Sequence, residues 1–283
     1  MEISGIWSKG AEKGVVDMAE VTVKDIYNEL DKFSPFSTQL SFDNAGFLVG
    51  RNGQSVESLL VALDITEEVT AEAAELGCQL IVSHHPVIFH PVRAITGETP
   101  TGRILLSLIE NRISAICAHT NLDAAVGGVN DALAERLGLV VQDVLEPSGL
   151  DGQNRAIGIG RVGEVSGTPD LPAFAEYVKE RLAANGVRYV DAGRPVRRVA
   201  VGGGACGDML ELAVAKGCDT FVTSDVKYNQ FLDAKAMGVN LIDAGHYPTE
   251  NVVCPILVER LRAAFPCVNV LLSARHGEVF SYK

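Results

Sequence analysis

The sequence predicts an α/β protein, α+β in its overall make-up, with two related domains from an internal duplication, each a mixed sheet with flanking helices. Three observations favour this fold. Short apolar segments typical of buried strands alternate with helix-like segments, this alternation occurs twice along 283 residues, and the two copies align with a constant offset. We expect a first unit over residues 22–145, a second over residues 146–283, and a metal site in the cleft between them.

The first unit opens with a helix over residues 23–33. Strand-like segments at residues 59–63, 79–83 and 113–118 then alternate with helix-like segments at residues 67–76 and 103–110. This βαβαβ order is typical of largely parallel strands joined by crossover helices. Residues 1–21 carry scattered Gly, Lys and Glu with weak periodicity, so we expect a loosely ordered extension there.

The second unit repeats this order. Its strand-like segments are residues 199–203, 220–223 and 240–243, its helix-like segments are 208–216 and 231–237, and helices over 171–184 and 251–264 flank them. An offset of 140 residues places Val61 on Val201, and a second offset of 127 places His119 on His246. Two unrelated βαβ units can also align this well. The duplication is favoured because polar residues follow the strands at matching points.

Composition and charge limit the functional classes. The chain is 47% hydrophobic and 21% charged, which is ordinary for a globular protein. Its net charge of −12 disfavours nucleic acid as a partner, because Lys and Arg neutralise phosphates, although a local basic surface formed on assembly stays compatible with it. No apolar run approaches the ~20 residues that span a bilayer. Six cysteines without CxxC spacing favour a reducing compartment, so we expect a cytoplasmic protein without a membrane partner.

Two adjacent histidines, His84 and His85, follow the apolar segment 80–83 and precede Pro86. Adjacent residues of a regular strand point to opposite faces, so both imidazoles can serve one site only where the strand has ended. Pro86 favours that end because it lacks a backbone donor. Ligands of open α/β sheets bind beyond the carboxyl ends of strands, and two imidazoles there indicate a divalent metal.

Further polar residues follow strands at the same predicted edge: His119, Asp123, Asp225, His246 and Glu250. Imidazole together with carboxylate is the ligand mixture of Zn, Fe and Mn sites. Five or six such ligands exceed what one tetrahedral ion uses. We therefore predict two divalent ions about 3.5–4 Å apart, joined by a bridging carboxylate, a role for which Asp123 is favoured.

Several of these residues also fit a purely structural role. His119 alone fits a half-buried histidine satisfied by hydrogen bonds, and Asp123 and Glu250 fit the first turns of following helices. Asp64 fits a helix start as well as a place near the ligands. The metal hypothesis is favoured because all these features fall at one edge of the fold. Two histidines lie off the repeat and have no assigned role, His90 and His276.

The glycine-rich segment 202–207 matches G-x-G-x-x-G between a strand and a helix, with Asp225 eighteen residues further on. This is the pattern of a dinucleotide-binding turn. It lies in mid-chain, however, and does not open a full nucleotide-binding domain. We favour an anion hole in which backbone amides around Gly204 hold a phosphate beside the metals.

Five stretches of the chain carry a family resemblance. They are SFDNAGFLVG at 41–50, SHHPVIF at 83–89, AHTNLD at 118–123, TSDVKY at 223–228 and DAGHYPTE at 243–250. Together they resemble the Nif-three-like dinuclear metal-centre proteins, also called GTP cyclohydrolase I type 2 homologues, over residues 22–272. The resemblance implies two related α/β domains around a central cleft and a ring-shaped homohexamer. It also implies a two-metal ligand set of His84, His85, Asp123, His246 and Glu250.

The predicted function is metal-dependent hydrolysis of a nucleotide-like or phosphorylated small molecule, in which His119 orients a ligand or carries a proton. The resemblance implies attack on the guanine ring of GTP with release of formate. Lys227 and the loop at Gly204 would then hold the triphosphate, while Asp64 and Asp225 would lie near the ligands or the substrate. The alternative is a ring-shaped metal-binding scaffold or regulatory protein that binds protein or nucleic acid. Open coordination positions favour catalysis over this alternative.

Overall fold

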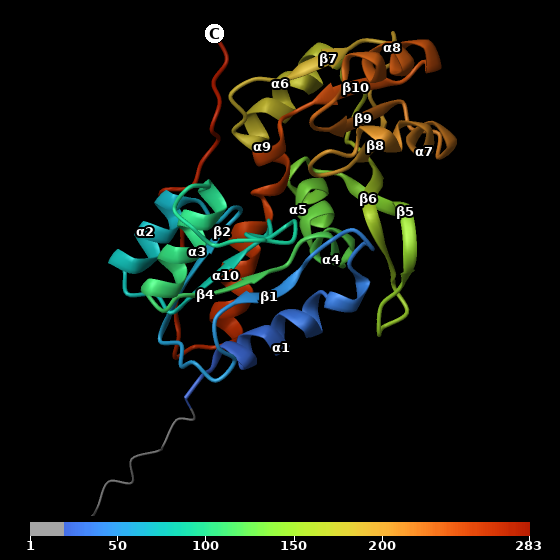
Figure 1. Cartoon of the computed structure of the whole chain (residues 1–283). Helices are drawn as coiled ribbons and strands as arrows, with labels where there is room; N and C mark the ends of the chain where they lie inside the picture. The colour runs from blue at the N-terminus through green and yellow to red at the C-terminus, as the bar shows by residue number, and fades with distance from the viewer. Residues whose placement is uncertain (1–19) are drawn as a thin grey trace, which may run out of the picture.

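The computed structural model describes residues 20–283, which form two mixed sheets with helices around them (Figure 1). The predicted fold class is therefore confirmed. The predicted loose extension over residues 1–21 lies outside the described residues, except at its last two positions. Among the helices of residues 20–283, none is both long and apolar enough to cross a membrane.

The first sheet has the strand order β1-β4-β3-β2-β11. Its strands are β1 (Gly46–Val49), β2 (Ser58–Ala62), β3 (Leu80–Ser83), β4 (Ser114–Cys117) and β11 (Asn269–Leu272), and its helices are α1 (Val23–Phe33), α2 (Glu67–Glu75) and α3 (Pro100–Glu110). β1 is antiparallel to β4, and the other neighbours are parallel. Every residue of β2 and β3 is buried, which explains their near-continuous apolar sequence.

The second sheet has the strand order β5-β6-β8-β9-β10-β7. Its strands are β5 (Val140–Leu150), β6 (Ala156–Glu164), β7 (Arg188–Val190), β8 (Arg198–Val201), β9 (Thr220–Thr223) and β10 (Asn240–Asp243). Its helices are α6 (Leu171–Leu182), α7 (Leu210–Ala215) and α8 (Tyr228–Met237), with a short 3-10 turn, η2 (Gly207–Met209), before α7. β8, β9 and β10 are parallel, whereas β6 and β7 run antiparallel to β8 and β10.

Both halves contain the same arrangement of four strands. Three parallel strands alternate with helices, and a preceding strand pairs antiparallel with the last of them, giving β1-β4-β3-β2 in one half and β7-β10-β9-β8 in the other. The offset of 140 residues holds for β3 and β9, which span residues 80–83 and 220–223. The structure therefore agrees with an internal duplication.

The second predicted offset is wrong by one residue. β4 spans residues 114–117 and β10 spans residues 240–243, with equivalent pairing to their neighbours, so the offset is 126. Gly245, and not His246, is therefore the structural counterpart of His119. The prediction matched residue types across the loop, whereas the fold keeps the distance from the strand end.

The sheets do not divide the chain between residues 145 and 146, where we predicted the boundary. β5 already begins at Val140, and β11 returns from the C-terminal region to complete the first sheet. Two helices also exchange partners. Leu133 of α5 (Val129–Arg136) packs in the core of the second half, whereas Leu257 of α10 (Val253–Ala264) packs in the core of the first, near α1 (Figure 1). This exchange ties the halves together.

Candidate metal centre

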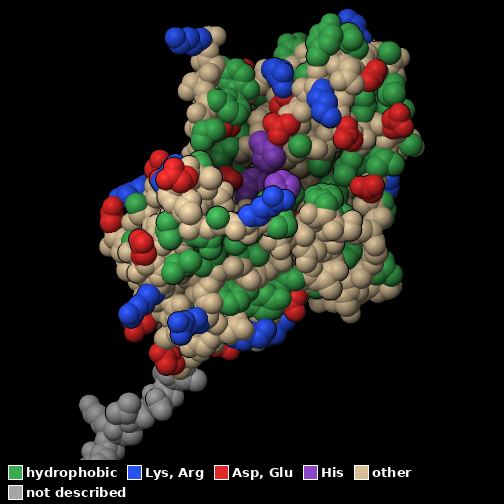
Figure 2. Space-filling model, viewed as in Figure 1, with side chains coloured by type: hydrophobic (Ala, Val, Ile, Leu, Met, Phe, Trp, Pro, Cys, Tyr) green, Lys and Arg blue, Asp and Glu red, His purple; other side chains and the backbone are tan. Residues whose placement is uncertain are grey.

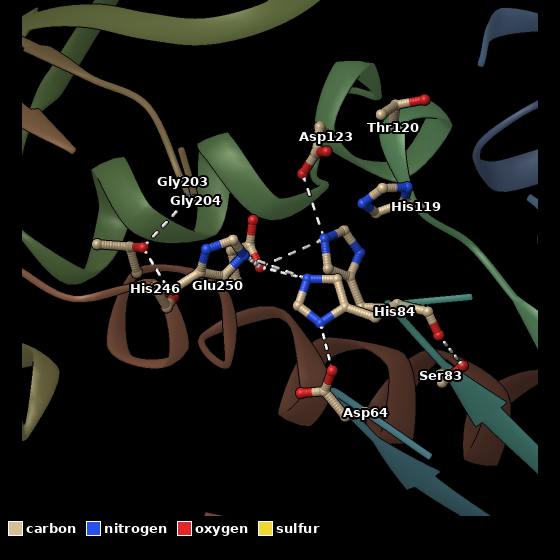
Figure 3. Close-up of polar contacts among 12 residues, drawn as sticks. Asp64, Ser83, His84, His119, Thr120, Asp123, Gly203, Gly204, His246 and Glu250 are labelled. Atoms are coloured by element: carbon tan, nitrogen blue, oxygen red, sulfur yellow. Dashed lines mark hydrogen bonds and ion pairs between the residues drawn. The ribbon is translucent and has the colours of Figure 1, made fainter. Parts of the chain in front are cut away.

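The predicted metal ligands come from the ends of strands in both sheets. β3 is followed by His84 and His85, and β4 is followed by α4 (Thr120–Ala124), which carries Asp123. β10 is followed by α9 (His246–Glu250). Figure 3 shows these side chains converging from the two halves. Since parallel strands of one sheet end at the same edge, the duplication brings two such edges together at one site.

The adjacent histidines serve one site because β3 ends at Ser83, as predicted. The Ser83 hydroxyl donates to the backbone carbonyl of His85 (2.8 Å) and stabilises the turn after the strand. His84 is fully buried, and its Nδ1 lies 2.8 Å from the carbonyl oxygen of Ala118. The two imidazole centroids are 4.9 Å apart, so both rings reach the same centre.

Glu250 lies at the middle of the centre. Its Oε2 atom is 2.9 Å from Nε2 of His85, 2.9 Å from Nε2 of His246 and 3.7 Å from Nε2 of His84. Among the imidazoles of residues 20–283, Asp123 pairs with His84 alone, at 3.6 Å. Two compact groups of ligand atoms contain a carboxylate: His85 with His246 and Glu250, and His84 with Asp123 and Glu250. Glu250, rather than Asp123 as predicted, is therefore the carboxylate common to both groups.

Three atoms at this centre are buried without a hydrogen bond of acceptable geometry within residues 20–283: Nε2 of His84, Oδ1 of Asp123 and Oε2 of Glu250. Buried polar atoms are almost always satisfied, because leaving one unpaired costs about 1–3 kcal/mol. Nε2 of His84 lies 3.6 Å from the Asp123 oxygen and 3.7 Å from the Glu250 oxygen, so the three atoms surround one small volume. Cations coordinated there would satisfy all three, so the residues fit a metal centre.

Nδ1 of every imidazole at the centre lies at hydrogen-bond distance from an oxygen atom. Nδ1 of His85 is 2.7 Å from Asp64, and Nδ1 of His246 is 2.6 Å from Asp225. Metal-bound histidines commonly donate their second N–H to a carboxylate or carbonyl, which fixes the tautomer and leaves the other nitrogen for the metal. The predicted positions of Asp64 and Asp225 near the ligands agree with this pattern.

His119 is held in the same way by a residue that the sequence did not reveal. Its Nδ1 lies 2.7 Å from Oδ1 of Asp43, whose other oxygen accepts hydrogen bonds from the backbone N–H and the hydroxyl of Thr120. Asp43 lies in the loop before β1 and follows no strand, so no periodic pattern marks it. His119 also groups with His84 and His85 at metal-binding distances.

The centre carries more carboxylate than cationic charge. Burial would lower the pKa of His85, but the adjacent carboxylates of Asp64 and Glu250 outweigh it and raise that pKa to about 10. For His246, burial is likewise outweighed by the carboxylates of Asp225 and Glu250, which raise the pKa to about 11. Burial, together with the neighbouring charge of Glu250, raises the pKa of Asp123 to about 6. A potential that retains protons on two imidazoles also attracts divalent cations.

Three amides of the glycine-rich loop, where we predicted an anion hole, already have acceptors within the fold. The amide of Gly203 donates to Asn130 (3.0 Å), that of Gly204 donates to Thr249 (3.1 Å), and that of Cys206 donates to the hydroxyl of Thr223. These donors are therefore not available to a phosphate. Gly204 has a different role, because its φ is +68° and a Cβ there would lie 2.1 Å from Oε1 of Glu250. Only glycine leaves room for the shared carboxylate.

Residues 21–277 match the family model described as Duf34/NIF3 (NGG1p interacting factor 3). The chain belongs to the Duf34/NIF3 family. A Clostridium perfringens protein named GTP cyclohydrolase 1 type 2 homolog is 35% identical over 238 residues, which cover 84% of this chain and 88% of that protein. A Bacillus cereus protein related to NIF3 has a similar structure (26% identity, TM-score 0.88), as has a Staphylococcus aureus hypothetical protein (32% identity, TM-score 0.86). Each covers 93% of this chain and 99% of its own.

A cavity of about 570 Å³ opens onto the centre of this Duf34/NIF3 protein. Figure 2 shows histidine side chains gathered in a hollow on this face. His85, His119, Asp123, His246 and Glu250 line it, together with apolar residues. No Lys or Arg of the described residues lines it. Lys227, predicted to hold a phosphate, is exposed at the start of α8 and does not line the cavity.

Proposed function

We propose that this Duf34/NIF3 protein holds two divalent ions, Zn, Fe or Mn, through His84, His85, Asp123, His246 and Glu250. The observation that carries the proposal is the position of Oε2 of Glu250, which is buried, lies 2.9 Å from Nε2 of both His85 and His246, and is common to the two groups of ligand atoms that contain a carboxylate. We assign to it the bridging role that the sequence predicted for Asp123. The mixture of imidazole nitrogen and carboxylate oxygen suits these three metals.

The reaction that this centre supports best is hydrolysis. Two divalent ions bound here would lower the pKa of a bridging water and stabilise the charge that develops during hydrolysis. Five protein ligands shared by two ions leave coordination positions open, and the cavity gives a small molecule access to them. Structural metal sites are closed by protein ligands, so this access favours a hydrolase over a metal-binding scaffold or regulator.

We assign His119 a role in proton transfer at the cavity wall. Asp43 holds its Nδ1, which leaves Nε2 available to a substrate or a bound water. The alternative role, a further metal ligand, is separable by experiment. The substitution His119→Ala should lower turnover while the protein keeps two ions per chain. A fall in metal content would assign His119 to the ligands instead.

The cavity suits an organic ring more than a free polyanion. Leu40, Phe42, Phe89 and Ile159 line its walls, and the rings of Phe42 and Phe89 lie edge to face with centroids 6.5 Å apart. The name of the Clostridium relative supports a nucleotide-like substrate. Because no Lys or Arg of residues 20–283 lines the cavity, a phosphate on that substrate would be neutralised mainly by the metal ions.

Metal content tests the site assignment. Elemental analysis of the purified chain should give two divalent ions, and Glu250→Gln and His85→Ala should each remove at least one of them. His90→Ala is a matched control, because His90 is an exposed histidine outside every ligand group. Unchanged metal content in both ligand variants would refute the assignment.

An activity screen tests the reaction. Zn-, Fe- and Mn-loaded protein should be incubated with nucleotides, phosphoesters and cyclic amides, and Glu250→Gln should abolish whatever turnover is found. Release of formate from GTP would identify a cyclohydrolase. Hydrolysis of another substrate without formate from GTP would keep the hydrolase and remove the cyclohydrolase.

We further propose a ring-shaped homohexamer in a reducing, cytoplasmic setting. The edge strand β5 exposes Val140, Val141 and Leu150, which supports contact between copies, and all six cysteines are free. Light scattering should give the mass of six chains of 30.1 kDa each. A monomer at micromolar concentration would contradict the assembly but not the metal centre.

A further inference from the structure

His85 lacks the close packing that fixes His84. It lines the cavity of about 570 Å³ on one side and a second cavity of about 500 Å³ on the other, whereas the side chain of His84 is fully buried. Packing therefore restrains the His85 ring less, and its orientation depends on hydrogen bonds. The bond from Nδ1 to Asp64 (2.7 Å) is the one that leaves Nε2 directed at Glu250.

Asp64 is in turn held by a histidine that neither the repeat nor the family resemblance accounts for. Its Oδ2 lies 3.0 Å from Nε2 of His276, while Oδ1 faces His85. Asp64 has no other hydrogen-bond or ion-pair partner in the described residues. Without His276, its carboxylate would be fixed only by the imidazole that it has to orient. Burial would raise the pKa of Asp64, but the two imidazoles outweigh it and hold that pKa well below its ordinary value.

The fold explains why a residue so far along the chain reaches Asp64. β11 runs parallel to β2, so both strands end at the same edge of the sheet, and the turn after β11 lies beside the turn after β2. Glu72 of α2 accepts hydrogen bonds from the Ser273 hydroxyl and the Ala274 amide, and the His276 amide donates to Ser273 (3.2 Å). The ring of His276 also lies 5.0 Å from that of Tyr247.

We infer that His276 is a positioning residue for the proposed metal centre, which holds Asp64 so that Asp64 holds the ligand His85. This inference rests on the proposed function. The second half provides a contrast, because within residues 20–283 Asp225 pairs with His246 alone, and its side chain is 53% exposed, against 41% for Asp64. The pair of Asp64 and His276 therefore supports His85 through two side chains, whereas His246 is supported by Asp225 alone among the described residues.

Zinc affinity, measured by competition with a chromophoric chelator, tests the role of His276. His276→Ala should weaken the binding of one Zn²⁺ about 10-fold and alter the visible spectrum of the Co²⁺-loaded protein. His276→Gln keeps an N–H donor and should restore most of the affinity. Arg275→Ala is the matched control, because Arg275 lies on the same turn and pairs with Glu75 on the surface. This control should bind zinc as the unmodified chain does.

A double-mutant cycle shows whether His276 acts through Asp64. In the Asp64→Ala background, His276→Ala should produce no further loss of affinity. Unchanged affinity of His276→Ala, equal losses in the Ala and Gln variants, or an equal loss in Arg275→Ala would each overturn the inference while the metal centre stands. An unmodified chain that binds no Zn²⁺ would overturn both. Thermal unfolding of the metal-free variants checks that each is folded.

Discussion

Gly204 is the position at which one added methyl group tests the metal centre most directly. A Cβ at residue 204 would lie 2.1 Å from Oε1 of Glu250 and 3.0 Å from its Cδ. Non-bonded heavy atoms need roughly 3.5 Å, so the carboxylate would have to move by about 1 Å or more. Metal–ligand distances tolerate deviations of only about 0.2 Å. We expect Gly204→Ala to lose Glu250 as the shared ligand and to hold at most one ion per chain.

Gly217→Ala separates this clash from backbone strain. The φ of Gly217 is +69°, against +68° for Gly204, but a Cβ at residue 217 meets no atom within 4 Å. Both substitutions should therefore destabilise the metal-free chain by about 1–2 kcal/mol, measured by denaturant unfolding, because both force alanine into the left-handed region. Only Gly204→Ala should weaken zinc binding, by at least about 100-fold. Two ions at unchanged affinity in Gly204→Ala, or equal metal loss in Gly217→Ala, would refute the reasoning.

Three further predictions concern the ligands and the exchanged helices. His85 and His246, with pKa values of about 10 and about 11, retain protons that the unfolded chain loses above about pH 6.5. Their contribution to the stability of the metal-free chain is thus full below that pH and falls as the pH rises toward 10 and 11. Zn²⁺ replaces these protons, so the increase in Tm that Zn²⁺ causes should be larger at alkaline than at mildly acidic pH. A pH-independent increase would contradict this. Asp225→Asn should weaken zinc binding about 10-fold in chelator competition, because an uncharged amide oxygen is a weaker acceptor for His246 than the carboxylate, and unchanged affinity would show that this pair does not support the centre. Leu257→Ala should lower the free energy of unfolding by about 2–5 kcal/mol in urea titrations, because this α10 side chain is fully buried in the core of the first half. A loss below about 1 kcal/mol would indicate that α10 adds little to that core.

Local pattern in the sequence was sufficient to predict the parallel strands β2, β3, β4, β8, β9 and β10 and the edge at which the candidate site lies. β3 and β9 are short, apolar and fully buried, so their ends could be read from composition, and the two histidines after β3 lie where that end predicts. The same reasoning predicted the histidines and carboxylates that the structure brings together at this edge. Each of these features depends on a few neighbouring residues.

Features that depend on how far a side chain extends, or on contacts between residues distant in the sequence, could not be predicted in this way. Whether Asp123 or Glu250 is shared depends on how far each side chain extends into the cleft, and an error of one residue in the second offset went unseen in the sequence. Asp43 and His276 come from a loop and a tail without periodicity, and they meet their partners only through long-range packing. The return of β11 to the first sheet likewise has no local signal.

The duplication of the fold has not duplicated the chemistry, and the differences between equivalent positions are what build the centre. With the offset of 140 residues, Asp225 stands where the first half has the proposed ligand His85, and Gly204 stands where the first half has Asp64. In the second half, Asp225 therefore supports a histidine where the first half has an imidazole, and Gly204 leaves space where the first half has the supporting carboxylate of Asp64. Glu250 occupies that space and reaches across to His85. If residue 204 were an aspartate, as residue 64 is, its carboxylate would compete with that of Glu250 for the same space. The difference between these equivalent positions is therefore what allows Glu250 to be common to both ligand groups.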